Sequence, residues 1–347
     1  MKILHLLKSN KFSGAEGVAL MIMSLFPEDE CIYASPDGPI REAVEARQQT
    51  FYPLKSSDYT GIKCAIDNID PDIIHAHDMG ASVLAAIAAP NSHIVSHIHN
   101  SDFKARKVSI KSLSYLLCSK RFSNIVWVSN SCFNGYVFHN ELKQKSSILY
   151  NVVNQEEIRQ KVKLDVNDYN YDVVYVGRIA DPKNPLRLIR ILNIIHNKKS
   201  DIRVAIIGTG DLLNAVKNEV KNYHIEDNVD FYGFMSNPFK ILQSAKVMVM
   251  TSDREGTPMS ALEAMALGVP IVSTSVDGLC ELIDSGTTGY LQDNDSEFAE
   301  SVLRLVLDVK TQKMFSKATL KRFQKMNNIS KYGEEIRKIY ESINLKE

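Results

Sequence analysis

The chain has 347 residues, which favours about two domains of roughly 150 residues, each large enough to bury its own core. Its 41 basic and 41 acidic side chains balance, so the overall charge argues against a nucleic-acid-binding protein and leaves any charged partner to a local patch. The five cysteines are scattered without a C-x-x-C pair, which indicates neither a disulfide framework nor a zinc knuckle.

Two short apolar runs bear on the cellular location of the protein. Residues 3–7 are too few for the apolar region of a signal peptide, and residues 79–89 fall far below the roughly 18 needed to span a bilayer. Together with the unpaired cysteines, they predict a soluble cytoplasmic protein. A peripheral position at the inner face of a membrane is compatible with the same runs.

Short apolar runs alternate with longer segments of helical periodicity in both halves of the chain. The strands expected in the first half are residues 2–7, 31–35, 72–77, 93–99 and 124–129. Those expected in the second half are residues 171–177, 201–208, 228–233, 246–252 and 269–274. The alternation predicts an α/β fold with two Rossmann-like domains, each a parallel sheet covered by helices.

A polar segment, residues 154–170, separates the two halves, and we interpret it as a linker. We therefore expect domains at residues 1–165 and 166–328, followed by a C-terminal helix, residues 329–347, that packs back on the first domain. The apolar residues of this helix, spaced as one face, are Tyr332, Ile336, Ile339, Tyr340 and Ile343. In such folds ligands bind beyond the carboxyl ends of the strands, and the space between domains suits a second substrate.

Small residues follow the first expected strand. Ser13, Gly14 and Ala15 precede a helical pattern. Small residues at a strand-to-helix turn let backbone N–H groups approach an anion, which the helix dipole also favours. A tight turn shaped by Gly14 explains them equally well.

Two cations follow the first strand of the second half. Arg178 comes directly after the strand, and Lys183 precedes a helical pattern. Two cations at a strand's carboxyl end suit a diphosphate, with solvated surface charges as the alternative. The next strand ends in Gly208 and Gly210, but Leu213 stands where the dinucleotide fingerprint needs a third glycine, which disfavours a nicotinamide enzyme.

Residues 253–268, DREGTPMSALEAMALG, contain two carboxylates in unusual places. Thr257 is a candidate N-cap with Pro258 at the first helical position, so the free N–H groups of this helix would face a ligand. Glu255 then lies in the loop, and Glu263 lies about one and a half turns into an otherwise apolar helix. As alternatives, Glu255 could interact favourably with the helix dipole from outside the helix, and Glu263 could be an ordinary surface carboxylate. A carboxylate on a mostly buried helix requires a specific partner, which ligand hydroxyls would supply.

The pattern E-G-x-x-x-x-x-x-E, followed by A-x-A-x-G-x-P, resembles the signature of the retaining nucleotide-sugar glycosyltransferases of family 4, which have the GT-B fold. Further matching stretches, in family order, are SGAE, HIHN, YNVVN, the G-R-x-x-x-x-K of residues 177–183, IIGTG, FYGF and TSDREG. The resemblance covers nearly the whole chain. It is nearest to bacterial enzymes that build capsular polysaccharide, exopolysaccharide or O-antigen.

The resemblance implies a role for each charged candidate. Arg178 and Lys183 match the clamp on the donor diphosphate, which would also stabilise the departing nucleoside diphosphate in place of a metal. Glu263 matches the carboxylate that holds the ribose hydroxyls, and Glu255 the one that contacts the transferred sugar. His99 matches a first-domain histidine near the reacting carbon. All of these except Glu263 are catalytic candidates, and neither a metal nor a cofactor is expected.

The resemblance also implies contacts made by the backbone. The segment of Gly256, Thr257, Pro258 and Met259 would meet the sugar and the phosphate. Gly14 lies where the family's glycine-rich loop approaches the donor phosphate and the acceptor. One departure is Asn184, which stands where the family often has glycine.

The function implied is transfer of a hexosyl residue from a nucleoside diphosphate sugar, UDP-linked in preference to GDP-linked, to a lipid-linked or growing glycan bound on the side of the first domain. Retention would follow from a front-face displacement in which the leaving phosphate helps to deprotonate the acceptor. Two alternatives remain. A UDP-sugar epimerase of the same fold would need no acceptor, and a dinucleotide-dependent oxidoreductase would bind NAD.

One basic segment concerns a further partner. Residues 104–121 carry six basic and no acidic side chains, interleaved with apolar ones. Such a segment predicts contact with an anionic leaflet or a lipid diphosphate. A solvated basic helix with a core-facing side is the alternative. Nucleic acid is not expected, because the patch is confined and the overall charge is neutral.

Overall fold

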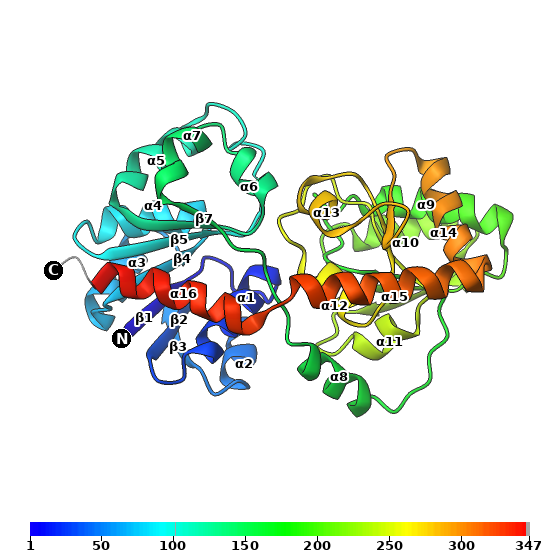
Figure 1. Ribbon diagram of the computed structural model, residues 1–347, viewed down its shortest axis with the longest axis horizontal. Helices are drawn as coiled ribbons and strands as arrows, with labels where there is room; N and C mark the ends of the chain where they lie inside the picture. Colours follow the sequence, from blue (N-terminus) through cyan, green and yellow to red (C-terminus); the bar gives the residue numbers. More distant parts are fainter. Residues whose placement is uncertain (101, 345–347) are drawn as a thin grey trace. The chain divides into compact units, whose positions relative to one another are not determined.

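The structure is a computed structural model that describes residues 1–100 and 102–344. The chain forms two compact units (Figure 1): one of Met1–Asn151 with the C-terminal segment from Ser330, and one of Val152–Ile329. The chain thus enters the second unit before the predicted boundary at residue 165. Residues 345–347 of the predicted C-terminal segment lie outside the described residues.

A seven-stranded parallel sheet forms the centre of the first unit. Its strands are β1 (Lys2–Leu6), β2 (Glu30–Pro36), β3 (Thr50–Leu54), β4 (Ile73–His77), β5 (His93–Ile98), β6 (Phe122–Trp127) and β7 (Ser146–Ile148). Their order in the sheet is β3-β2-β1-β4-β5-β6-β7. The five predicted strands fill the middle, and β3 and β7, which the apolar runs do not predict, form the edges.

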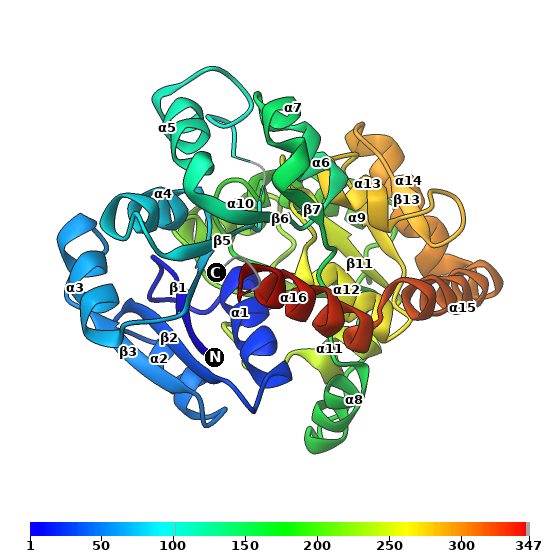
Figure 2. The same cartoon turned by 60° about the vertical axis from the view of Figure 1, so that its left-hand side comes forward.

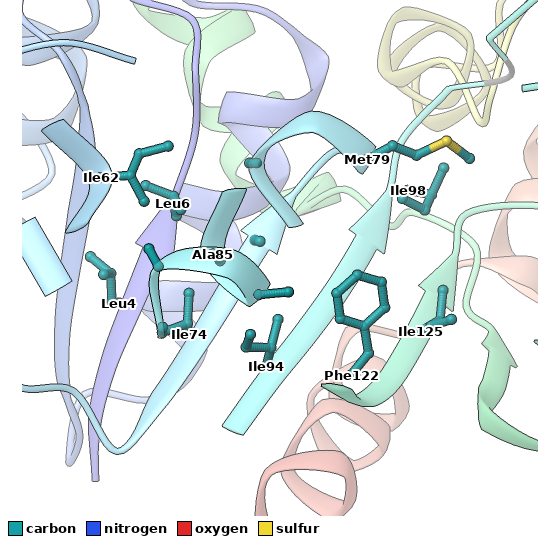
Figure 3. Packing of buried hydrophobic residues seen from close by; sticks show 14 of the residues in the cluster. Leu4, Leu6, Ile62, Ile74, Met79, Ala85, Ile94, Ile98, Phe122 and Ile125 are labelled. Atoms are coloured by element: carbon teal, nitrogen blue, oxygen red, sulfur yellow. The ribbon is translucent and has the colours of Figure 1, made fainter. Parts of the chain in front are cut away.

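Helices cover both faces of this sheet. They are α1 (Gly14–Leu25), α2 (Ile40–Glu45), α3 (Tyr59–Ile69), α4 (Met79–Ala88), α5 (Ile110–Cys118), α6 (Asn130–Asn134), α7 (His139–Leu142) and α16 (Ile329–Asn344). Alternate side chains of a strand point to opposite faces. On one face Leu4, Leu6 and Ile74 pack against Ile62 of α3 and Ala85 of α4 (Figure 3).

The C-terminal helix, α16, lies on the opposite face beside α1 (Figures 1 and 2). Its five predicted apolar residues are all buried, with at most 8% of any side chain exposed. The Tyr340 hydroxyl lies 2.6 Å from His75 Nδ1 on β4. Arg337 forms an ion pair with Asp29 at 2.7 Å and lies over the Phe26 ring at 4.3 Å. The helix is therefore an integral part of the first unit.

The second unit is built on a six-stranded parallel sheet of order β10-β9-β8-β11-β12-β13. Its strands are β8 (Val173–Val176), β9 (Val204–Ile207), β10 (Val229–Gly233), β11 (Val247–Met250), β12 (Ile271–Ser273) and β13 (Gly289–Leu291). Its helices are α8 (Gln155–Leu164), α9 (Pro185–Lys198), α10 (Leu213–Asn222), α11 (Phe239–Ser244), α12 (Met259–Ala266), α13 (Asp277–Leu282), α14 (Asp295–Leu307) and α15 (Val309–Met326). Buried clusters lie on both faces. The predicted α/β fold with two Rossmann-like parallel sheets is confirmed.

The predicted linker is wrong, because its first part is the helix α8. Asn154 caps this helix by accepting a hydrogen bond from the Glu157 N–H at 3.1 Å. Only Ile158 and Val162, one turn apart, are buried. A single buried pair is too short a pattern to reveal a helix in an otherwise polar segment.

Two connections join the units, one after Asn151 and one before Ser330. Close to both, the Val153 N–H donates to Asn327 Oδ1 at 2.8 Å, and Asn327 Nδ2 donates to the Val153 carbonyl at 3.0 Å. The outgoing and returning segments are thus held side by side.

Candidate functional site

Two loops of the second unit meet beyond the carboxyl ends of the neighbouring strands β8 and β11. The Thr251 hydroxyl lies 3.1 Å from the Lys183 carbonyl and 3.0 Å from that of Asn184, and can donate to either. The Asp253 N–H donates to the Pro182 carbonyl at 2.9 Å. Asn184 Nδ2 donates to Asp253 Oδ1 at 3.0 Å. These bonds fix the lysine loop against the loop that follows β11.

Lys183 and Glu255 are brought together by these loops. Lys183 Nζ lies 2.5 Å from Glu255 Oε1, and the Glu255 carboxylate is only 7% exposed. The Ser252 hydroxyl donates to the same oxygen at 2.7 Å, and the Glu255 N–H donates to Asp277 Oδ2 at 3.1 Å. No described residue donates to Oε2, so that oxygen is available to a ligand hydroxyl.

Arg178 is an exposed cation beside this pair. Among the described residues its guanidinium has no hydrogen-bond or ion-pair partner, while the Tyr175 hydroxyl donates to its backbone carbonyl at 2.9 Å. Burial raises the pKa of Tyr175; the Glu255 carboxylate raises it further, and the Arg178 guanidinium lowers it. Both charges therefore act on one hydroxyl group at the end of β8.

Asn184 occupies the left-handed region, with φ of 49°, immediately before α9. Glycine adopts this conformation without strain, and asparagine is among the few other residues that tolerate it. The departure from glycine therefore preserves the turn that follows Lys183.

The helix after the acidic loop begins at Met259, one residue later than predicted. Pro258 is its N-cap, and the prediction of Thr257 as the cap is wrong. The proline carries no side-chain acceptor, so the first N–H groups of α12 receive no side-chain cap. They remain suited to an anion, as the sequence indicated.

Glu263 is the fifth residue of α12 and is half-buried, while its neighbours on the helix are fully buried. Its carboxylate forms no hydrogen bond or ion pair with any described residue. Burial raises the pKa of Glu263 to about 7; Lys161 lowers it and Glu157 raises it. A buried carboxylate without a partner is costly, which is the expected property of a group that awaits a ligand.

Two glycines allow close packing of the site's backbone. A Cβ on Gly278, at the start of α13, would lie 1.6 Å from the Gly256 carbonyl oxygen. A Cβ on Gly208 would lie 1.9 Å from the Gly177 carbonyl oxygen, and Gly208 has φ of +140°. No side chain fits at either position without moving a loop of the site.

Sequence reasoning missed three residues that support Glu255: Ser252, Asp277 and Gly278. Ser252 is in the quoted TSDREG stretch, but nothing there shows that its hydroxyl faces the carboxylate. Asp277 and Gly278 follow shortly after β12, so the rule that ligands gather beyond strand ends was the signal available for them.

The first unit has a cavity of about 260 Å³ beyond the carboxyl ends of β1, β4 and β5. Its polar lining consists of Lys8, Asp78, His99, Asn100, Asp102 and Lys111. Lys111 forms an ion pair with Asp102 at 2.7 Å, and burial raises the pKa of Asp78. His99, a predicted site residue, therefore lies at a concave, polar surface that suits a hydroxyl-rich ligand.

Gly14 is the first residue of α1, so it belongs to the helix rather than to a turn before it. Its φ is not positive, unlike that of Gly208, which disfavours the tight-turn alternative. Gly14 and His99 belong to the first unit, whereas Arg178, Lys183 and the two glutamates belong to the second.

The basic segment forms a loop, the helix α5 and a short 3-10 helix, Ser119–Arg121. Tyr115 and Ala105 of its aromatic and aliphatic side chains are buried in the core. The exposed ones are Val108 (64%), Ile110 (89%), Leu113 (43%) and Leu117 (68%), and Phe103 (60%) directly before the segment is exposed as well. The helix α5 has a core-facing side, because Tyr115 is buried and Leu116 and Cys118 pack against the core. The alternative of a basic helix with such a side therefore stays open, and the exposed apolar side chains lie outside that side. Across residues 1–100 and 102–344, no helix is both long and apolar enough to cross a bilayer.

A family model described as glycosyl transferases group 1 matches residues 154–322, nearly all of the second unit and just under half of the chain. The second unit is therefore similar to domains of this kind. Together with the two parallel sheets, this similarity supports a glycosyltransferase with the GT-B fold. The solved structure of Alr3699/HepE from Anabaena in complex with UDP-glucose covers 99% of this chain and 100% of that chain with a TM-score of 0.87 and 18% identity. This likeness shows the fold.

Curated relatives carry glycosyltransferase names. The poly(glycerol-phosphate) alpha-glucosyltransferase of Bacillus subtilis (strain 168) is 22% identical over 68% of this chain and 36% of its own length. An Escherichia coli enzyme is 23% identical over 98% of this chain and 96% of its own. Its name is UDP-Gal:alpha-D-GlcNAc-diphosphoundecaprenol alpha-1,3-galactosyltransferase. The chain thus spans about a third of the first relative and nearly all of the second.

Proposed function

We propose that this chain is a metal-independent, retaining glycosyltransferase of family 4 that transfers a hexosyl residue from a nucleoside diphosphate sugar. UDP is favoured over GDP as the nucleotide, because the Anabaena structure holds UDP-glucose and the E. coli relative is named for UDP-Gal. The acceptor is a lipid-linked or growing glycan of bacterial capsule, exopolysaccharide or O-antigen. The relative named for a diphosphoundecaprenol-linked acceptor supports that choice.

The Lys183–Glu255 pair is the observation that carries this proposal. It places a cation and a buried carboxylate within 2.5 Å of each other, beside the exposed Arg178. Cations match a diphosphate, whereas a carboxylate oxygen without a donor matches a sugar hydroxyl. A nucleotide sugar presents these two groups next to each other, and Glu263 adds a carboxylate for the ribose.

The proposed reaction is a front-face displacement. The acceptor hydroxyl oxygen bonds to the anomeric carbon as the bond from that carbon to the diphosphate oxygen breaks, and the hydroxyl proton passes to the leaving phosphate. Arg178 and Lys183 offset the charge that develops on the diphosphate. His99, Gly14 and the backbone of residues 256–259 are proposed to hold the sugar and the phosphate. No side chain is required as the base.

A screen of UDP- and GDP-sugars, read by thermal shift and by release of nucleotide, tests the donor. We expect stabilisation by one UDP-sugar, sugar transfer with retained configuration, and activity that persists in a chelator. Arg178→Ala should reduce turnover at least a hundredfold, at the magnitude of a lost charge-stabilising donor, while the melting temperature stays close to that of the parent. Arg159→Ala, an exposed arginine on α8, is the matched control.

Other outcomes would overturn the proposal. An isomerised nucleotide sugar from donor alone would indicate the epimerase, and NAD binding would indicate the oxidoreductase. Full turnover in Arg178→Ala would show that the donor site is assigned wrongly.

We further propose that the basic segment, residues 104–121, rests together with Phe103 on an anionic membrane surface, where a lipid-linked acceptor is found. Five exposed apolar side chains alternate with basic ones, of which Lys107 lies over the Phe103 ring at 4.6 Å. Apolar groups insert between lipid headgroups while cations meet their charge, and each basic group adds about 1 kcal/mol near such a surface.

Sedimentation with vesicles of anionic or neutral lipid tests this contact. Binding should require anionic lipid, weaken with salt and fall in the double variant Ile110→Ser with Leu117→Ser. Leu307→Ser, which changes an exposed leucine of the second unit, should leave binding unchanged. Equal binding to neutral vesicles, or no loss in the double variant, would contradict the assignment.

A further inference from the structure

Five histidines lie together in the first unit, and the function proposed above uses only one of them. His5 is on β1, His75 and His77 are on β4, and His97 is on β5, with His99 just beyond it. The alternation of side chains along each strand puts all of them on the face opposite the cluster of Figure 3. The four histidines on strands are at most 2% exposed.

Hydrogen bonds divide these rings into two separate chains. His5 Nδ1 lies 3.0 Å from His77 Nε2, and His77 Nδ1 lies 2.8 Å from His99 Nε2. We call these three residues the histidine chain. In the other set, His75 lies between Tyr340 and His97, at 2.6 and 3.1 Å. Only the histidine chain ends at the cavity, where His99 forms part of the lining.

The ring geometry fits in-plane hydrogen bonds. The His77 and His99 rings are 15° from parallel with centroids 5.1 Å apart, and those of His5 and His77 are 26° from parallel with centroids 5.3 Å apart. With nitrogens at 2.8 and 3.0 Å, the rings meet edge to edge. A zinc ion needs about 2.0–2.1 Å to each nitrogen, so facing nitrogens this close leave no room for one. Two sets of the five histidines have ligand atoms within 4.8 Å of one another: His5 with His75 and His77, and His77 with His97 and His99. Each set contains one of the two facing pairs, at 3.0 and 2.8 Å, whose spacing favours N–H···N bonds.

The chain has one direction of hydrogen bonding. Burial lowers the pKa of His5 and His99 to about 3 and that of His77 well below its usual value, so all three imidazoles are neutral near pH 7. A neutral imidazole has one N–H donor and one acceptor. If His77 donates to His99, it must accept from His5. If His99 instead donates to His77, then His77 must donate to His5.

The two ends of the chain decide between these directions. His5 Nε2 and His99 Nδ1 are both buried and without a partner among the described residues. One direction leaves an N–H on His5, which is fully buried in the core. The other puts it on Nδ1 of His99, which is also buried but belongs to a ring that forms part of the cavity lining, so only this N–H can gain an acceptor when a ligand fills the cavity. An orphaned buried N–H is among the rarest groups in proteins, which favours the second direction.

We propose that His5 and His77 are positioning residues that hold His99 in the Nδ1–H tautomer and in one ring orientation, so that it donates to a ligand oxygen at the cavity. The inference rests on the proposed function for the identity of that ligand, a sugar hydroxyl. The tautomer itself does not depend on it. A neighbouring hydrogen-bond partner that fixes the tautomer of a functional histidine is a general device of active sites.

Nitrogen-15 NMR of the histidine rings tests the tautomer without an assay of activity. In the full chain, His99 should show a protonated Nδ1 and an unprotonated Nε2, with its signals assigned by their loss in His99→Asn. His77→Leu should leave a mixture of tautomers. In His97→Leu, which removes a buried ring stacked on His99 at 4.1 Å without a hydrogen bond to it, the tautomer should be unchanged.

An Nε2–H tautomer in the parent protein, or no change in His77→Leu, would overturn the proposal. Stoichiometric binding of Zn²⁺ or Co²⁺ that His77→Leu abolishes would also overturn it, in favour of a metal site. These outcomes leave the proposed function standing, because donor binding by the second unit is measured separately.

Turnover gives a second readout. His77→Leu should lower kcat about tenfold, the value of one lost hydrogen bond near 1.4 kcal/mol, with KM for the donor nearly unchanged. His77→Asn, whose amide replaces the donor at the Nδ1 position, should restore most of kcat and the single tautomer. Equal losses in the leucine and asparagine variants would show a purely structural role.

Discussion

Glu263 is a half-buried carboxyl group whose titration lies in an accessible pH range. Burial raises its pKa from 4.5 to about 7, and ligand hydroxyls bind the ionised form better. We therefore expect a UDP-sugar to bind more tightly at pH 8 than at pH 6. A UDP-sugar is the appropriate probe, because its diphosphate diester lacks the terminal phosphate proton that titrates near pH 6. Calorimetric titration of the parent and Glu263→Gln should show the pH dependence only in the parent.

The same group gives a stability prediction with a definite sign. Between pH 4.5 and 7 the folded protein retains a proton that the unfolded chain has lost, so the free energy of unfolding falls as pH rises through this window. Glu263→Gln removes this loss. Relative to the parent, it should gain up to roughly 3 kcal/mol between pH 4.5 and 8, measured by urea unfolding at each pH. A constant difference between the two proteins would contradict the assigned pKa.

Lys183 compensates a buried charge, so its removal should affect stability as well as turnover. Lys183→Met leaves the Glu255 carboxylate with Ser252 as its remaining side-chain donor, at an expected cost of about 2–3 kcal/mol. Adding Glu255→Gln should recover much of that loss, because no buried charge is left, without recovering turnover. Chemical denaturation of the two variants tests this. A double variant less stable than Lys183→Met would contradict the role of the ion pair.

The positions of Glu255 and Glu263 could be predicted, because each position depends on local sequence. The first lies in a loop and the second on a helix whose start the Thr-Pro pair places within one residue. The contacts of Glu255 with Ser252 and Asp277 could not be predicted in the same way. The Asp277 contact depends on how separate strand ends meet, and the Ser252 contact, although three residues away, depends on the conformation of the loop, which no local pattern contains.

At the scale of elements, α13 supports the acidic loop through the hydrogen bond of Asp277 and through one close backbone approach at Gly278. Gly278→Ala would put a methyl group 1.6 Å from the Gly256 carbonyl oxygen, so the loop that holds Glu255 must move. We expect a loss of at least about 2 kcal/mol, as for overpacking of a core, and a large loss of donor turnover. Gly17→Ala is the matched control within a helix, because its Cβ would meet only Phe12 at 3.5 Å. It should be neutral or up to about 1 kcal/mol stabilising.

The elements that sequence reasoning missed share a physical reason. The strands β3, β7 and β13 are all at sheet edges, where only one neighbour is present and a continuous apolar run is not required. Pro53 within β3 further weakens the sequence pattern of that strand, although proline is tolerated in an edge strand. The central strands are buried on both faces and could be predicted from their apolar runs alone.

At the scale of the whole molecule, the first unit is built from two separated parts of the chain. Residues 1–151 supply its sheet, and α16 returns to cover one face with five buried apolar residues. Burial of such a side chain contributes about 1.5–3 kcal/mol, which together is comparable with the 5–15 kcal/mol that stabilises a domain. The sequence indicated this return from the apolar face of α16, while the partner of Tyr340, His75, became evident only in the structure.

This organisation predicts that the second unit can be excised. Because Val153 and Asn327 hold the two connecting segments together, a linker of about six residues of glycine and serine is long enough to join Asn151 to Ser330. The joined first unit should unfold cooperatively on heating, since it keeps α16. Residues 1–151 alone should expose the face that carries His75 and aggregate or unfold. Ile336→Asp in the joined protein is the control, because a charge in place of a fully buried isoleucine should reproduce the loss of α16. If residues 1–151 alone were as stable as the joined protein, α16 would contribute nothing to the first unit.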